Sequence, residues 1–153
     1  MMRHYFHSHQ GALDAFPGEA RTEIEDALET CSIRIERGSA AAIRDHLVRS
    51  LGQNGWPDEF QVEPPSKITI ASLKNGVGLC MQTGGNMSRM YADLLKLQKL
   101  YLEDAISTGA IILPTSKASR DLGDNIANAD RLAAELKIFR RVIHMPIAVF
   151  SFE

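Results

Sequence analysis

The residues with the clearest chemical potential lie in one short stretch of the chain. Two β-rich runs, at 67–74 and 77–83, are joined by an Asn-Gly pair. Such a pair is typical of a type I′ hairpin, because both central residues need positive φ. Side chains two positions apart share a face of a strand, so Cys80 and Gln82 are expected opposite a core-facing set that begins at Val77. Since paired strands hold side chains rigidly, this hairpin is a candidate functional site.

Basic and hydroxyl side chains follow the hairpin. Residues 84–89 lead from the second run into a predicted helix, where backbone N–H groups can bind an anion. Ser88 and Arg89 are therefore candidate phosphate contacts, although the segment could equally be a tight turn with no ligand. Lys117 and Arg120 form one of several later basic groups. They would track a phosphate backbone if they converged on one side, and would otherwise be a solvated helix surface.

Several of these residues also have a purely structural interpretation. Cys80 can be a small buried apolar side chain, and Gln82 can bond neighbouring backbone. His4, His7 and His9 have a spacing that suits a metal, but they lack an acidic or cysteine partner nearby, so we expect them to be solvated.

Apolar spacing predicts the elements that must hold these residues. Steps of three and four predict helices, and apolar runs bounded by Gly or Pro predict strands. The helices are expected at 22–37, 39–51, 88–107 and 125–141, and the further strands at 60–62, 110–113 and 147–152, after a partly ordered lead-in at 1–17. Ser39 is expected to cap the second helix, Val48 to face inward, and Trp56 to anchor the core. The pattern predicts an α/β fold with a mixed sheet flanked by helices.

Composition limits the class of protein. The chain has 153 residues, of which 44% are hydrophobic and 24% charged, which suits one globular domain over residues 1–153 and excludes disorder. We see no secretory signal and no apolar stretch long enough to cross a membrane. Two unclustered cysteines favour a cytoplasmic location. The net charge of -2 means that any nucleic-acid site must be a local basic surface.

At this point the sequence resembles a known family. The stretch Ile-Thr-Ile-Ala-Ser-Leu-Lys-Asn-Gly-Val-Gly-Leu-Cys-Met-Gln-Thr-Gly-Gly-Asn at 68–86 looks like the active-site hairpin of BglII-type restriction endonucleases, which belong to the PD-(D/E)XK nuclease superfamily. Segments 7–14, 22–29, 55–56, 89–96, 110–114 and 145–149 are similar to further parts of that family, in the same order. The resemblance implies a restriction-endonuclease-like fold, double-stranded DNA as partner, and a homodimer, with the helix at 89–108 as one candidate surface.

The catalytic residues of that family are not retained. Its hairpin carries an Asp and then a Glu-x-Gln, and the two acids bind the Mg²⁺ that activates water. By resemblance these positions fall on Ala71, Cys80 and Gln82, and Lys74 before the turn also matches. An alanine cannot ligate, and a thiol is a soft ligand that does not suit Mg²⁺. We therefore expect a pseudoenzyme without a cofactor, with Mg²⁺ needed only if activity is retained.

Other functions remain open from the sequence. A carboxylate from Glu25, Glu29, Glu36, Glu59 or Glu63 could enter the site, which would give an active Mg²⁺-dependent endonuclease with relocated ligands. A degenerate chain could instead pair with a nuclease or methyltransferase of a restriction or defence system. A third alternative is an interaction or regulatory subunit that does not bind DNA, which the weak net charge slightly favours.

Overall fold

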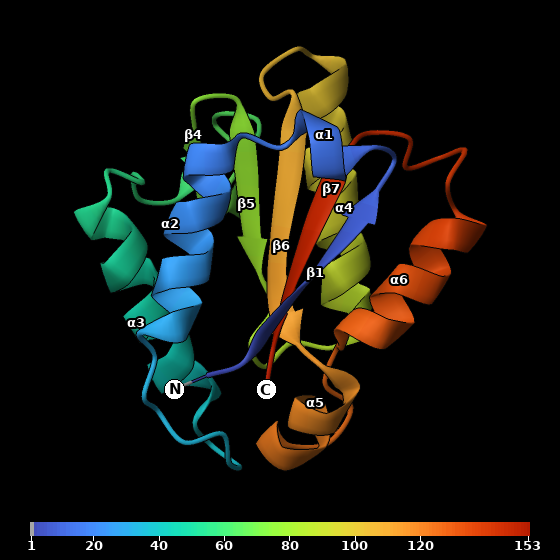
Figure 1. The fold of residues 1–153 in the computed structure, drawn as a ribbon. Helices are drawn as coiled ribbons and strands as arrows, with labels where there is room; N and C mark the ends of the chain where they lie inside the picture. Colours follow the sequence, from blue (N-terminus) through green and yellow to red (C-terminus); the bar gives the residue numbers. More distant parts are fainter. Residues whose placement is uncertain (1) are drawn as a thin grey trace.

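The computed structural model describes residues 2–153 and has a central sheet between two layers of helices (Figure 1). The sheet has five strands in the order β1-β7-β6-β5-β4. These strands are β1 (His4–His9), β4 (Ser72–Lys74), β5 (Val77–Met81), β6 (Thr108–Pro114) and β7 (Ile147–Phe152). Two short strands, β2 (Phe60–Gln61) and β3 (Thr69–Ile70), pair separately. The predicted α/β fold with a mixed, helix-flanked sheet is confirmed.

Helices cover both faces of the sheet. They are α1 (Ala12–Ala15), α2 (Gly18–Glu29), α3 (Ala40–Gln53), α4 (Met87–Leu102), α5 (Ser116–Leu122) and α6 (Ala129–Ile138). Buried side chains of α2 and α3 share one core with one face of the sheet, and those of α4 and α6 share a second core with the other face. In Figure 1, α5 lies beyond the ends of the central strands.

The central strands are buried on both faces, as the uniformly apolar run at 110–113 predicts. Ala110 and Ile112 belong to the first core, whereas Ile111 and Leu113 belong to the second. β5 pairs with β6, and β6 with β7, in parallel register. This confirms the parallel strands expected after the hairpin, because α4 and the α5–α6 segment supply the long connections that parallel pairing needs.

The hairpin has the predicted turn. β4 and β5 pair antiparallel, with Lys74 opposite Val77, and the loop residues Asn75 and Gly76 have φ of 49° and 78°. The expectation of a single core face on β5 is wrong. Cys80 lies in the second core, because α4 covers the face of β5 that was expected to lie opposite the core.

The N-terminal residues form a strand and not a partly ordered lead-in. β1 pairs antiparallel with β7 along its whole length. Phe6 packs edge-on against Phe150, with ring centroids 5.3 Å apart. Arg3 and Glu153 exchange two backbone hydrogen bonds of 2.9 and 3.0 Å beyond the end of this pair. Pairing with a strand so distant in sequence leaves little local signal, which is why periodicity missed β1.

The first long helix is shorter than the predicted 22–37. α2 begins after Pro17 and ends at Glu29, and the hydroxyl of the next residue, Thr30, donates to the Asp26 carbonyl. Residues 31–36 are irregular, and their side chains alternate between more buried and exposed. Ile35 therefore packs against the first core from an extended segment and not from the helix stripe. Glu36 lies on this segment too, so its predicted place on the first helix is wrong.

Two other helices differ from expectation in detail. α3 forms as predicted, but Val48 is 45% exposed, and the Ser39 hydroxyl bonds the Glu36 backbone and does not cap the helix. α4 ends at Leu102 and not near residue 107. Leu95 and Leu102 are each 65% exposed, so the inward face of α4 is narrower than the apolar pattern indicates.

The predicted helix at 125–141 is confirmed as α6, which is shorter at both ends, and a further helix, α5, precedes it. α5 was missed because its seven residues are mostly polar, and its main sequence signal is Thr115, whose hydroxyl accepts from the Ala118 N–H. α6 begins later, where the Asn128 side chain accepts from the Arg131 N–H. Within residues 2–153, no helix combines the length and apolar character needed to cross a membrane.

Candidate functional site

A cleft of about 560 Å³ opens where the end of β5 meets α3 and α4. Its wall comes from α3, from the segment before the hairpin, from the turn after β5 and from the first turns of α4. The lining side chains that carry charge or an amide are Arg44, Glu59, Gln82, Arg89, Asp93 and Lys96. Ala71 and Cys80 also line it. The cleft therefore brings the predicted hairpin residues Cys80 and Gln82 together with side chains of α3 and α4.

Cys80 lies at the base of the cleft as a buried side chain. It is 2% exposed and packs in the second core beneath α4. Burial, and then the negative charge of Asp93, raise the pKa of the Cys80 thiol well above its usual range. The thiol is therefore neutral at physiological pH and supplies no thiolate for a metal or for nucleophilic attack.

Gln82 is held by an acidic residue that the sequence analysis did not select. Its side-chain N–H donates to Asp93 at 2.5 Å, and the Lys96 ammonium lies 3.3 Å from the other carboxylate oxygen. Asp93 is only 5% exposed. A Cβ at Gly85 would lie 2.0 Å from the Gln82 side-chain oxygen, so glycine lets this amide fold over the turn. The signal for Asp93 was its place on the helix face that also carries Leu97 and Met90.

Positive charge exceeds negative charge on the cleft wall. Arg44, Arg89 and Lys96 face two carboxylates, and one of these, Asp93, is already engaged by Lys96. Arg44 donates to the Met81 carbonyl at 3.2 Å, which fixes its guanidinium beside the cleft. Among residues 2–153, Arg44 and Arg89 form no ion pair. Their charges are free for an anionic ligand.

The other predicted DNA contacts do not line this cleft. Lys74 points elsewhere: its ammonium lies 3.0 and 2.9 Å from the two carboxylate oxygens of Glu23 and donates to the Asn54 carbonyl. Ser88 is exposed in the first turn of α4, next to Arg89. Lys117 and Arg120 lie on α5, past the carboxyl ends of β6 and β7. Lys74 is thus separated from the phosphate-binding candidates, whereas Ser88 adjoins them.

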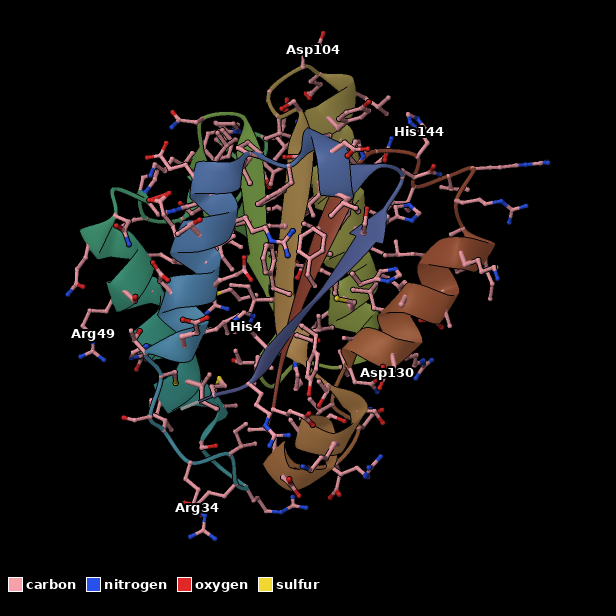
Figure 2. All side chains as sticks on the ribbon, viewed as in Figure 1. His4, Arg34, Arg49, Asp104, Asp130 and His144 are labelled. Carbon is pink, nitrogen blue, oxygen red and sulfur yellow. The ribbon has the colours of Figure 1, made fainter. Side chains whose placement is uncertain are left out.

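Only one of the five proposed replacement carboxylates reaches the cleft. Glu59 lines it and is exposed. The other four pair with basic side chains: Glu25 and Glu29 with His4, Glu36 with Arg34, and Glu63 with Lys99. Figure 2 shows His4 between β1 and α2, and Arg34 pointing outward.

The N-terminal histidines do not gather round one point. His4 faces the acids of α2, whereas the His9 ring bonds the Ile143 carbonyl at 2.6 Å and is buried. His7 is exposed. Their predicted solvated state is correct for His7 and wrong for His9, because the Ile143 carbonyl holds the His9 ring in a buried position.

The donor set does not fit the Mg²⁺ that the family resemblance implies. Ala71 and Cys80 supply a methyl and a neutral thiol where a hard cation needs oxygen. The Asp93 carboxylate already accepts from Gln82 and Lys96. No group of three or more His, Cys, Asp or Glu side chains within residues 2–153 is arranged to hold a metal.

Comparison with known proteins agrees with the fold, which is that of a restriction-endonuclease-like protein. The sequence pattern of the family described as restriction endonuclease BglII/BglIII matches residues 4–152, so the chain belongs to that family. A comparison with curated protein sequences gives no match.

Two solved structures show the same architecture. The crystal structure of restriction endonuclease BglII complexed with a DNA 16-mer matches with a TM-score of 0.84 at 10% identity, covering 97% of this chain and 75% of that one. Free BglII matches with a TM-score of 0.73 at 11% identity, covering 97% and 78%. At such low identity these structures show the fold alone. The chemistry of the cleft must be inferred from the residues that line it.

Proposed function

We propose that this protein binds double-stranded DNA through the cleft and has lost metal-dependent cleavage. The observation that carries the proposal is the composition of the cleft wall. Arg44 and Arg89 line it and form no ion pair among residues 2–153, and Ala71 and Cys80, which the sequence resemblance aligns with the family's two acids, line it too. Cations that face a phosphate retain affinity for the DNA backbone. A site without two oxygen ligands does not hold the metal that activates water for cleavage.

Phosphate contacts are assigned to residues on the carboxyl side of the sheet. Arg89 and Ser88 bind the backbone at the cleft, and Lys117 and Arg120 on α5 extend the surface. Lys74 holds the hairpin against α2 through Glu23, because its charge is already matched there. The crystal structure of BglII with a DNA 16-mer supports duplex DNA as the ligand class. We place this activity in the reducing cytoplasm, since Cys31 and Cys80 are free and buried.

A second copy of the chain is the proposed partner. Leu95 on α4 and Ile138, Phe139 and Val142 at the end of α6 are exposed by 65%, 69%, 42% and 62%. Tyr91 links the two helices, with its ring 6.3 Å from that of Phe139. An apolar patch of this kind on a soluble protein is typical of an interaction surface, and a two-fold dimer covers it with the same patch. A nuclease or methyltransferase of a defence system would be a competing occupant of this patch.

DNA binding is tested by fluorescence anisotropy with a labelled duplex of random sequence at low salt. Arg44→Ala and Arg89→Ala should each weaken binding about fivefold, the effect of one lost phosphate contact. Arg49→Ala is the matched control on α3, because Arg49 does not line the cleft and its side chain points outward (Figure 2), so its loss should leave affinity unchanged. No binding at micromolar protein would overturn the proposal and leave a subunit that does not bind DNA.

A relocated nuclease site is the second candidate, because Glu59 and Asp93 both line the cleft. Plasmid incubated with the protein and Mg²⁺ or Mn²⁺ tests it. We expect supercoiled plasmid to stay intact. Metal-dependent cleavage that disappears in Glu59→Gln or Asp93→Asn would contradict the loss of catalysis and establish relocated ligands.

A further inference from the structure

A second cavity adjoins the cleft and differs from it in chemistry. This side compartment has a volume of about 420 Å³ and shares Arg44, Glu59, Ala71 and Met81 with the cleft. Away from that shared wall its surface is mainly apolar and comes from Val48, Leu51, Trp56, Pro57 and Leu79. A cationic cleft and an apolar compartment therefore meet along one wall, between α3 and the hairpin.

The shared wall explains how one ligand could occupy both spaces. Ala71, which lines both cavities, contributes only a methyl group to the shared wall and no charge. Arg44 also lines both cavities and brings a positive charge to that wall. A ligand with an anionic end and a flat, weakly polar body matches this pair of spaces.

We propose that the side compartment holds the base of an unstacked nucleotide whose phosphate lies in the cleft. This inference rests on the proposed function, because the same cations hold the phosphate. Arg44 and Arg89 carry the phosphate charge, and the apolar walls beside Trp56 and Pro57 accept the base. Asp58 and Glu59, at the exposed rim, accept hydrogen bonds from exocyclic amino groups.

The unpaired state of the base follows from the shape of the site. A base inside a duplex is stacked and paired, so it must be at a strand end or be extruded to enter a compartment beside the backbone site. Mononucleotides present the same phosphate and base without the free-energy cost of unstacking and unpairing the base. They are therefore the sharpest probes of the compartment.

Trp56 makes the experiment direct, because it is the only tryptophan of the chain and lines the compartment. Its emission is followed during titration with dAMP, with 2-deoxyribose 5-phosphate and with inorganic phosphate. We expect dAMP to change the emission saturably and to bind about tenfold or more tightly than the base-free sugar phosphate, as a stacked base would require. Equal binding of dAMP and the sugar phosphate, or no binding of dAMP, overturns the inference.

A pair of substitutions locates the base. Val48→Asp places a carboxylate at the mouth of the compartment and should remove the preference for dAMP over the sugar phosphate. Val48 is 45% exposed, so this change spares the core. Leu13→Asp on α1 is the control, because Leu13 is 62% exposed and does not line the compartment. A preference for dAMP that survives Val48→Asp would place the base elsewhere and contradict the assignment.

Failure of this inference is distinguishable from failure of the proposed function. If labelled duplex binds but dAMP has no advantage over the sugar phosphate, the cleft binds backbone phosphate alone and only the base assignment fails. If the duplex does not bind and dAMP does not bind, the proposed function fails as well.

Discussion

The surroundings of the Cys80 thiol make it chemically unreactive. It is buried in the second core, 2% exposed, and its pKa is raised by that burial and by Asp93. A raised pKa keeps the neutral thiol to higher pH, and the thiol form does not attack disulfide reagents. Cys80 therefore contributes packing and no thiol reactivity.

Thiol reactivity tests this state. In the folded protein at pH 8, Cys80 should react with a disulfide reagent far more slowly than the two thiols of the denatured chain. The release of the coloured leaving group with time is the measurement. Cys31→Ala isolates the signal of Cys80, since Cys31 is also buried. Rapid reaction of Cys80 in folded Cys31→Ala would contradict a neutral, shielded thiol.

Asp93 has opposite effects on folding and on ligand binding. Asp93→Asn removes the charge that accepts from Gln82 and Lys96, which should lower the free energy of unfolding by about 1–3 kcal/mol, as expected for disrupted buried hydrogen bonds to a charged group. It also removes a negative charge from the cleft wall, so duplex DNA should bind more tightly. Urea denaturation and anisotropy measure the two effects.

Asp45→Asn is the control for that pair of measurements. Asp45 is exposed on α3, and its loss should leave the free energy of unfolding within about 0.5 kcal/mol, the usual range for surface changes. Weaker DNA binding by Asp93→Asn would show that the carboxylate contributes to the ligand site and does not oppose the phosphate.

At the scale of elements, the β4–β5 turn depends on the conformational freedom of a glycine. Gly76 has φ of 78°, and an added Cβ would lie 3.3 Å from the Ser107 hydroxyl oxygen. Gly76→Ala should therefore lower the free energy of unfolding by about 1–2 kcal/mol, the cost of a left-handed conformation for a residue with a side chain. Thermal and urea denaturation measure the change.

Gly52→Ala provides a matched comparison with the opposite sign. Gly52 lies in α3 with no atom within 4 Å of the added Cβ, and alanine should raise the free energy of unfolding by about 0.5–1 kcal/mol. Equal destabilisation by the two substitutions would indicate that conformation at Gly76 is not the cause.

The elements that sequence predicted well are those with strong local signals. The Asn-Gly pair located the hairpin, and uninterrupted apolar runs located β6 and β7. β1 has its partner at the other end of the chain, and α5 buries only a few of its seven residues, so neither has a clear local period. Residues 31–36 contain apolar spacing compatible with a helix, yet tertiary packing holds them extended.

The residues of the cleft also divide into those with a local sequence signal and those without one. Cys80 and Gln82 were predicted because alternation along one strand is a local property, and Arg89 because it follows a strand-to-helix turn. Arg44 and Asp93 were missed as site residues, since only the packing of α3 and α4 against the sheet brings them to the cleft. Lys74 shows the converse: the family resemblance placed it at the site, but Glu23 on α2 holds it elsewhere.

At the scale of the whole molecule, the exposed patch of α4 and α6 predicts a homodimer in solution. Leu95→Glu should shift the mass measured by sedimentation from dimer to monomer, because a charge in an apolar interface is desolvated without a partner. Leu13→Glu is the control, since Leu13 is 62% exposed on α1, away from the patch. A monomeric wild-type protein at micromolar concentration would contradict the dimer.

The pairing of β1 with β7, which the two hydrogen bonds between Arg3 and Glu153 extend, has a consequence for folding during translation. Among the strands of residues 2–153, β1 is made first and pairs in the sheet with β7, which is made last. While the ribosome adds the intervening residues, Tyr5 and Phe6 have no strand to pair with, and the loop to be closed spans nearly the whole chain. Completion of this sheet must therefore follow translation of residues 147–152, and a nascent chain halted before them would leave an unpaired aromatic edge open to aggregation.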